Sequence, residues 1–151
     1  MTTSRRTRAR PVRLLSPILR LVAAGGLIVD AYVHLKLASA YDAIKSGTLS
    51  QGDLFRAEAA LAAVAVLVVL IARRPILTAL PAAIAGGGLV ALVLYRYVDL
   101  GAIGPLPPMY EPVWYSDKVI TCAAQGVASL SVVALFLLQN GFPIRRRGGD
   151  E

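Results

Sequence analysis

The sequence predicts an all-α integral membrane protein with four transmembrane helices, paired as two hairpins in one bundle. Hydrophobic residues make up 56% of the 151 residues, and the mean hydropathy is +0.63. Both values are typical of a membrane protein rather than a soluble domain. The apolar residues also gather into four runs, each long enough to cross a hydrocarbon core about 30 Å thick.

The basic residues predict the orientation of this bundle. The net charge is +7, and arginines gather at residues 5–13, 73–74 and 145–147, all on one side of a four-span protein. Cytoplasmic loops carry such an excess, so we expect both termini in the cytoplasm and the chain in the plasma membrane. The clustering favours anionic lipid as the partner of the basic tails, and we do not expect nucleic-acid binding.

The first predicted span covers residues 14–37 and follows a basic tail, residues 1–13, that is too polar to pack. Arg20 lies near enough to the cytoplasmic end for its side chain to extend to the interface. Together, spans and outer loops form one predicted domain, residues 14–139.

Two processing alternatives exist for the first span. Arg5-Arg6 resembles part of a twin-arginine signal, and Ala38-Ser39-Ala40 has the form of a signal-peptidase site. Asp30 and Lys36 interrupt a segment that should be uncharged in a signal peptide. The length of the apolar run also favours a retained anchor.

The second span, residues 51–72, follows a first outer loop at residues 38–50. Ser50 and Asp53 have the spacing of a capping box, in which the serine precedes the helix and the acid lies in its first turn. The third span, residues 76–98, carries small residues at every fourth position, which permit close approach of another helix. These residues are Ala79, Ala83, Gly87 and Ala91.

The second outer loop, residues 99–117, contains four prolines within ten residues, which favour extended backbone over helix. These are Pro105, Pro107, Pro108 and Pro112. Ser116 is the predicted N-cap of the fourth span, residues 119–138. A second cytoplasmic tail, residues 140–151, completes the chain.

Ionisable and amide side chains recur in the outer halves of all four spans. Charged side chains cost about 2.5–3.5 kcal/mol each at mid-membrane, so such groups are usually paired or functional. We predict that they converge in one polar cluster: Asp30, His34, Glu58, Arg96 and Gln125. The alternatives are a purely structural Asp30/His34 pair, an interfacial Glu58, and an Arg96 paired with Asp99.

The second outer loop also carries a candidate docking surface. Its residues are Met109, Tyr110, Glu111, Trp114 and Tyr115. Tyrosine and tryptophan at this depth are commonly interfacial anchors. A proline-stiffened aromatic segment loses little entropy on docking, so it is also suited to cover the bundle as a lid or to bind a partner.

The sequence indicates no cofactor, no metal ligands and no catalytic residues. Bis-histidine haem ligation needs two histidines, and His34 is the only one; a shared haem in a homodimer, or Met109 as the second ligand, are the alternatives. The single cysteine, Cys122, excludes an intramolecular disulfide. Phosphate-binding loops, nucleophile elbows and HExxH motifs are absent from the sequence.

Three segments together resemble a family of small, uncharacterised actinobacterial membrane proteins. They are His34-Leu-Lys-Leu-Ala-Ser-Ala-Tyr-Asp42, Leu54-Phe55-Arg56-Ala57-Glu58 and Gly104-Pro-Leu-Pro-Pro-Met-Tyr-Glu-Pro-Val-Trp-Tyr115. The resemblance implies no reaction. In its layout of four short spans with a polar outer half, the chain also looks like DoxX-like proteins, but topology does not imply function.

These observations favour a non-enzymatic membrane component that docks a partner through its aromatic loop. We expect its partners to be the bilayer, other membrane proteins or further copies of itself. The alternative is a small-ligand or proton-coupled carrier, or a redox accessory, that uses the polar cluster as its site. An enzyme with His34 as acid or base is the weakest hypothesis, because no nucleophile or metal accompanies it.

Overall fold

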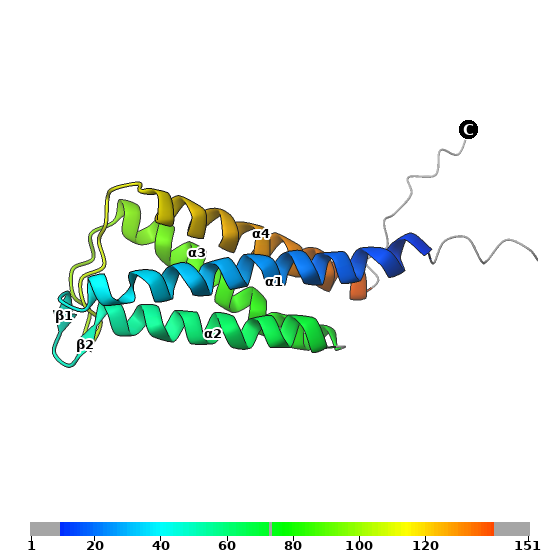
Figure 1. Ribbon diagram of the computed structural model, residues 1–151, viewed down its shortest axis with the longest axis horizontal. Helices are drawn as coiled ribbons and strands as arrows, with labels where there is room; N and C mark the ends of the chain where they lie inside the picture. Colours follow the sequence, from blue (N-terminus) through cyan, green and yellow to red (C-terminus); the bar gives the residue numbers. More distant parts are fainter. Residues whose placement is uncertain (1–9, 73, 141–151) are drawn as a thin grey trace, which may run out of the picture.

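The computed structural model describes residues 10–72 and 74–140 (Figure 1). Apart from one short hairpin, the secondary structure of these residues is helical, and four helices are long and apolar enough to span a membrane. They are α1 (Arg10–Ala38), α2 (Gln51–Ile71), α3 (Ala79–Tyr97) and α4 (Ser116–Gln139). The predicted all-α fold with four long apolar helices is confirmed. The expected tails at residues 1–9 and 141–151, and Arg73, lie outside the described residues.

The four helices form a ring in chain order. α1 packs most extensively against α2 and α4, and α3 contacts the same two neighbours. The strands β1 (Lys45–Ser46) and β2 (Leu49–Ser50) and the loop at residues 98–115 lie at one end of the bundle, called here the loop end (Figure 1). The start of α1 and the ends of α2 and α4 lie toward the other end, called here the terminal end (Figure 1).

The starts of α1 and α4 differ from the predictions, whereas the start of α2 matches. α1 begins at Arg10, so residues 10–13 are helical rather than part of the tail. Its Pro11 lies in the first turn, where a missing N–H breaks no helical hydrogen bond. α4 begins at Ser116 itself, with Tyr115 as its cap residue and no side-chain cap, so the predicted serine cap is wrong. The capping box is confirmed, since Ser50 Oγ accepts from the Asp53 amide and the Asp53 carboxylate accepts from the Ser50 amide.

Small apolar side chains fill the terminal half of the bundle. The buried core consists of Ala23, Ala24, Leu27, Ala62, Ala65, Val69, Ile84, Ala85, Ala128, Val132 and Leu135. A Cβ on Gly26 would stand 2.6 Å from the Ala124 carbonyl oxygen, so the glycine lets α1 lie directly against α4. Alanine and glycine therefore set a short interhelical distance here, because the backbones approach closely.

The predicted roles of the α3 ladder and of Arg20 stay predictions. Ala83 and Gly87 of the ladder are exposed, and a Cβ on Gly87 would meet no atom within 4 Å. Arg20 Nη1 donates to the Val69 carbonyl near the end of α2. That carbonyl belongs to the last turn of the helix, which has few helical donors.

Ion pairs tie the helix ends together at the loop end. Lys36 on α1 reaches Asp117 on α4 at 2.8 Å. Arg56 on α2 donates two hydrogen bonds to the Asp42 carboxylate, at 2.7 and 2.8 Å. The Arg56 guanidinium holds the pKa of Asp42 below its ordinary value. These pairs are largely exposed, so each contributes little to stability.

Candidate functional site

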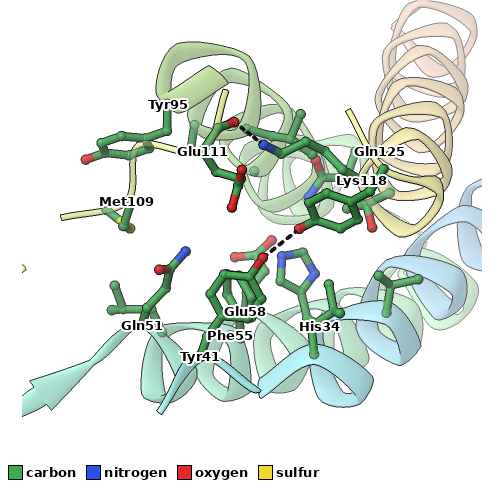
Figure 2. Close-up of a pocket in the computed structure, with 18 residues that line it drawn as sticks. His34, Tyr41, Gln51, Phe55, Glu58, Tyr95, Met109, Glu111, Lys118 and Gln125 are labelled. Carbon is green, nitrogen blue, oxygen red and sulfur yellow. Dashed lines mark hydrogen bonds between the residues drawn. The ribbon is translucent and has the colours of Figure 1, made fainter. Parts of the chain in front are cut away.

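A pocket of about 200 Å³ lies at the loop end of the bundle (Figure 2). All four helices and the loop at residues 98–115 contribute side chains to its wall. Figure 2 shows these side chains pointing into a common space. The polar residues that line it are His34, Gln51, Glu58, Glu111, Lys118, Thr121 and Gln125.

Asp30 lies behind this wall and organises two of the lining residues. It is fully buried, and its Oδ1 accepts a hydrogen bond from Gln125 Nε2 at 2.9 Å. His34 Nδ1 lies 3.0 Å from the same Oδ1 and 3.0 Å from the Asp30 backbone carbonyl. Because both neighbours are acceptors, Nδ1 must carry the proton. In the neutral ring, Nε2 is then the acceptor.

Gln125 presents its carbonyl oxygen without a partner. The side chain is 1% exposed, and among the described residues no hydrogen-bond partner contacts Oε1. The orientation of the amide follows from Asp30, since a carboxylate can only accept and therefore faces the NH₂ group. An acceptor therefore remains unsatisfied on α4 beside the pocket.

Glu58 lies close to Gln125 where α3 passes. A Cβ on Gly88 would stand 2.3 Å from Gln125 Nε2 and 2.9 Å from Glu58 Oε1, so any larger residue there would displace both side-chain tips. Within the described part of the chain, Glu58 Oε1 has no hydrogen-bond partner. Three helices thus bring a carboxylate and an amide together at Gly88.

Lys118 and Thr121 belong to the site but are missing from the predicted cluster. Lys118 is 8% exposed; its Nζ donates to the Glu111 carbonyl and lies 5.6 Å from the centre of the Tyr115 ring. Thr121 is 3% exposed, and its hydroxyl has no partner among residues 10–72 and 74–140. Lys118, Thr121 and Gln125 follow one another at intervals of three and four residues, which places them on one face of a helix. This spacing could have identified Lys118 and Thr121 from the sequence.

The loop closes one side of the pocket. Its Glu111 amide donates to the Tyr95 carbonyl at 3.0 Å, and the Tyr115 and Tyr41 hydroxyls lie 3.1 Å apart. Burial, followed by the hydrogen bond to Tyr41, raises the pKa of Tyr115 well above its ordinary value. Tyr115 is therefore a neutral phenol that links the loop to the end of α1.

The five candidate docking residues divide into two groups. Met109, Glu111 and Tyr115 line the pocket. Tyr110 and Trp114 are 42% and 40% exposed and lie outside it. The loop therefore presents one set of side chains to the interior and another to its surroundings.

Aromatic side chains form much of the remaining wall. Phe55 meets the His34 ring edge-on at 5.2 Å and the Tyr41 ring at 4.9 Å. Phe55 and Gln51 were not predicted as site residues, although their spacing from Glu58 places all three on one face of α2.

Arg96 does not line the pocket, in contrast to His34, Glu58 and Gln125. Its guanidinium lies 4.9 Å from the Tyr97 ring centre and 5.6 Å from that of Trp114. On α3 the pocket is lined by Gly88, Leu92 and Tyr95, and the next residue is rotated by about 100° on a helix of 3.6 residues per turn. Asp99, the expected alternative partner, accepts instead from the Gly101 amide.

The described residues contain no group of three His, Cys, Asp or Glu side chains placed to hold a metal ion. Cys122 is free and partly buried. The pocket sets carboxylate, amide, hydroxyl and ammonium groups beside aromatic and apolar walls. Concave sites of this composition are typical of small-molecule binding.

No protein-family model, curated protein or solved structure matches this chain. The resemblance to actinobacterial membrane proteins therefore stays a prediction from the sequence.

Proposed function

We propose that the protein is a multi-pass protein of the plasma membrane that binds a small molecule in the pocket at the loop end. The observation that carries this proposal is a set of buried polar atoms without partners on residues that line the pocket. They belong to Glu58, Thr121 and Gln125 among the described residues. Each such atom costs about 1–3 kcal/mol, which a ligand with matching groups would offset.

The outward faces of the helices support insertion in a bilayer. Large apolar side chains there are strongly exposed, as at Leu67 (61%), Ile71 (75%) and Leu130 (73%). Apolar side chains over the whole surface of a long helix are suited to lipid rather than water. The arginine clusters at residues 5–13 and 73–74 favour a cytoplasmic terminal end, with the pocket then on the outer side.

This orientation is tested by thiol labelling in intact cells. Cys122 is first replaced by serine, and single cysteines are then introduced as Ser46→Cys or Arg74→Cys. An impermeant maleimide should label the former and spare the latter until the cells are opened. The reverse pattern contradicts the proposed topology.

Binding is tested without assuming a ligand class. A library of amines, carboxylates and uncharged molecules is screened for compounds that raise the unfolding temperature of the detergent-solubilised protein. Thr121→Phe fills the pocket, whereas Ile120→Phe adds the same ring at a neighbouring residue that is 46% exposed and outside the pocket. At least one compound should stabilise wild type and Ile120→Phe but not Thr121→Phe. A library without any stabilising compound contradicts the proposal.

A second candidate function is partner docking through the outer face of the loop. Tyr110, Val113 and Trp114 are 42%, 58% and 40% exposed and lie within five residues. Aromatic side chains on a stiff segment are typical centres of interfaces. Co-purification of a stoichiometric membrane subunit with wild type, and its loss with Trp114→Ala, is the expected result; retention of the subunit excludes this surface.

A further inference from the structure

We infer that the pocket takes a small organic monocation, a protonated amine on an apolar or aromatic body. This inference rests on the proposed function, because it names the ligand class of the same pocket. It follows from the hydrogen-bond polarity of the pocket, from its charge and from the shape of its wall.

The unsatisfied groups in the pocket need a donor. Glu58 Oε1 is an acceptor, as is Gln125 Oε1, and the Thr121 hydroxyl both donates and accepts. Gln125 and Thr121 are 1% and 3% exposed, so water reaches them poorly. A ligand that places an N–H group among these oxygens satisfies them, while a second acceptor does not.

Two donors around the pocket already have partners. Gln125 Nε2 donates to Asp30, and Lys118 Nζ donates to the Glu111 carbonyl. His34 Nδ1 faces two acceptors of Asp30, which leaves its Nε2 as a further acceptor in the neutral ring. An incoming carboxylate or carbonyl is left with the Gln51 amide and the remaining N–H groups of Lys118 as donors.

The ionisable groups favour a positive ligand. Glu58 and Glu111 line the pocket, and Asp30 lies directly behind it, whereas Lys118 is the one basic residue besides His34 in the described lining. The Lys118 ammonium lies near the face of Tyr115 and is hydrogen-bonded to the loop. An ammonium group beside Glu58 would form a charge-assisted hydrogen bond in a site with limited water.

The remaining wall is suited to an apolar body. Figure 2 shows Met109 and Gln51 on the opposite side of the pocket from Gln125 and Lys118. Between these sides lie Phe55 and Tyr41, whose rings can contact both a cation and a hydrocarbon group. A volume of about 200 Å³ limits the occupant to a small molecule rather than a lipid chain.

The inference is tested with three probes of similar shape and different charge: 2-phenylethylamine, 2-phenylethanol and 3-phenylpropionate. Each is titrated by calorimetry into the full-length protein in nanodiscs. We expect the amine to bind at least about tenfold more tightly than the alcohol or the carboxylate, since a hydrogen bond between charged groups is stronger than a neutral one.

Matched variants separate the site from partition into lipid. Glu58→Gln keeps the shape and an acceptor but removes the charge, and should abolish the preference for the amine. Asp117→Asn makes the same chemical change outside the pocket, in the pair with Lys36, and should preserve it. If Glu58→Gln does not fold, Thr121→Val serves as the second variant and should weaken amine binding several-fold.

Three outcomes overturn the inference: equal binding of all probes, preference for the carboxylate, or no binding of the amine. Preference for the carboxylate would indicate that the pocket binds an anion through Lys118. These failures are distinguishable from failure of the proposed function, because the mixed library still reports whether the pocket binds any other class.

Discussion

The two ends of the bundle are built from the same four helices but differ in side-chain size and polarity. At the terminal end, alanine, glycine and valine bring the backbones together, and Ala65, Ala85 and Ala128 are fully buried. At the loop end, Phe55, His34 and Tyr41 occupy the helix faces and a pocket remains between them. Small residues close the bundle at one end, whereas bulky and ionisable ones hold it open at the other.

The boundary between these regions falls within one turn of α1. Gly26 lies against the α4 backbone and Leu27 is fully buried in the core, while Asp30 begins the polar network. The proposed function therefore places binding at the loop end and most of the stabilising core at the terminal end. Changes at the terminal end should affect unfolding most, and changes at the loop end should affect affinity most.

The largest expected effect is at the terminal end. Leu135→Ala removes a fully buried side chain from α4 and leaves a cavity, which should lower the free energy of unfolding by about 3 kcal/mol. Leu137→Ala is the matched control, because that leucine is 40% exposed on the same helix. Reversible unfolding in mixed micelles measures both; equal losses would show that the core is not where the structure has it.

Asp30→Ala tests the boundary. The change leaves Gln125 Nε2 and His34 Nδ1 without the carboxylate that accepts from them, so we expect a loss of about 2 kcal/mol in unfolding free energy. Lys36→Ala, which breaks an exposed ion pair on the same helix, should cost well under about 1 kcal/mol. A neutral effect of Asp30→Ala would indicate that the network is not formed.

Gly88→Ala tests the loop end. The added Cβ would stand 2.3 Å from Gln125 Nε2 and 2.9 Å from Glu58 Oε1, so both tips must shift. We expect affinity for 2-phenylethylamine to fall about tenfold, which corresponds to roughly 1.4 kcal/mol. Gly87→Ala is the control, since its Cβ would meet no atom within 4 Å. Equal affinities of the Gly88→Ala and Gly87→Ala variants in calorimetry would show that Gly88 does not shape the site.

The smallest effect concerns the exposed pair between Asp42 and Arg56. Because Arg56 lowers the pKa of Asp42 in the folded protein, the pair stabilises the fold above the unfolded-state pKa, near about 4. This contribution is lost as the pH falls through the lower folded-state pKa. Wild type should therefore be slightly more stable than Asp42→Asn at pH 7 and equal to it near pH 2. A difference that persists in acid contradicts this origin.

The helices could be predicted from the sequence because hydropathy and length determine them. The capping box at Ser50 and Asp53 was equally local and is confirmed. The start of α4 was not predicted correctly, because Ser116 lies inside the helix although serine is common at caps. Local signals of this kind fail when another residue, here Tyr115, takes the cap position.

The site could be predicted only in part. His34, Glu58 and Gln125 line the pocket and Asp30 supports two of them, so polarity within apolar runs was a sound guide to the region. Polarity alone does not show how each helix is rotated about its axis, and therefore which side chains face the pocket. Arg96 lies outside the pocket for this reason. On α4, the helical spacing of Lys118, Thr121 and Gln125 indicates that these three residues share the face turned toward the pocket.

The most direct test of the two-region account measures stability and affinity on the same two variants. Leu135→Ala should lose about 3 kcal/mol of unfolding free energy and bind 2-phenylethylamine like wild type below its unfolding transition. Glu58→Gln should lose at least about tenfold in affinity with little change in unfolding free energy. Loss of affinity in Leu135→Ala, or unchanged affinity in Glu58→Gln, would contradict the account.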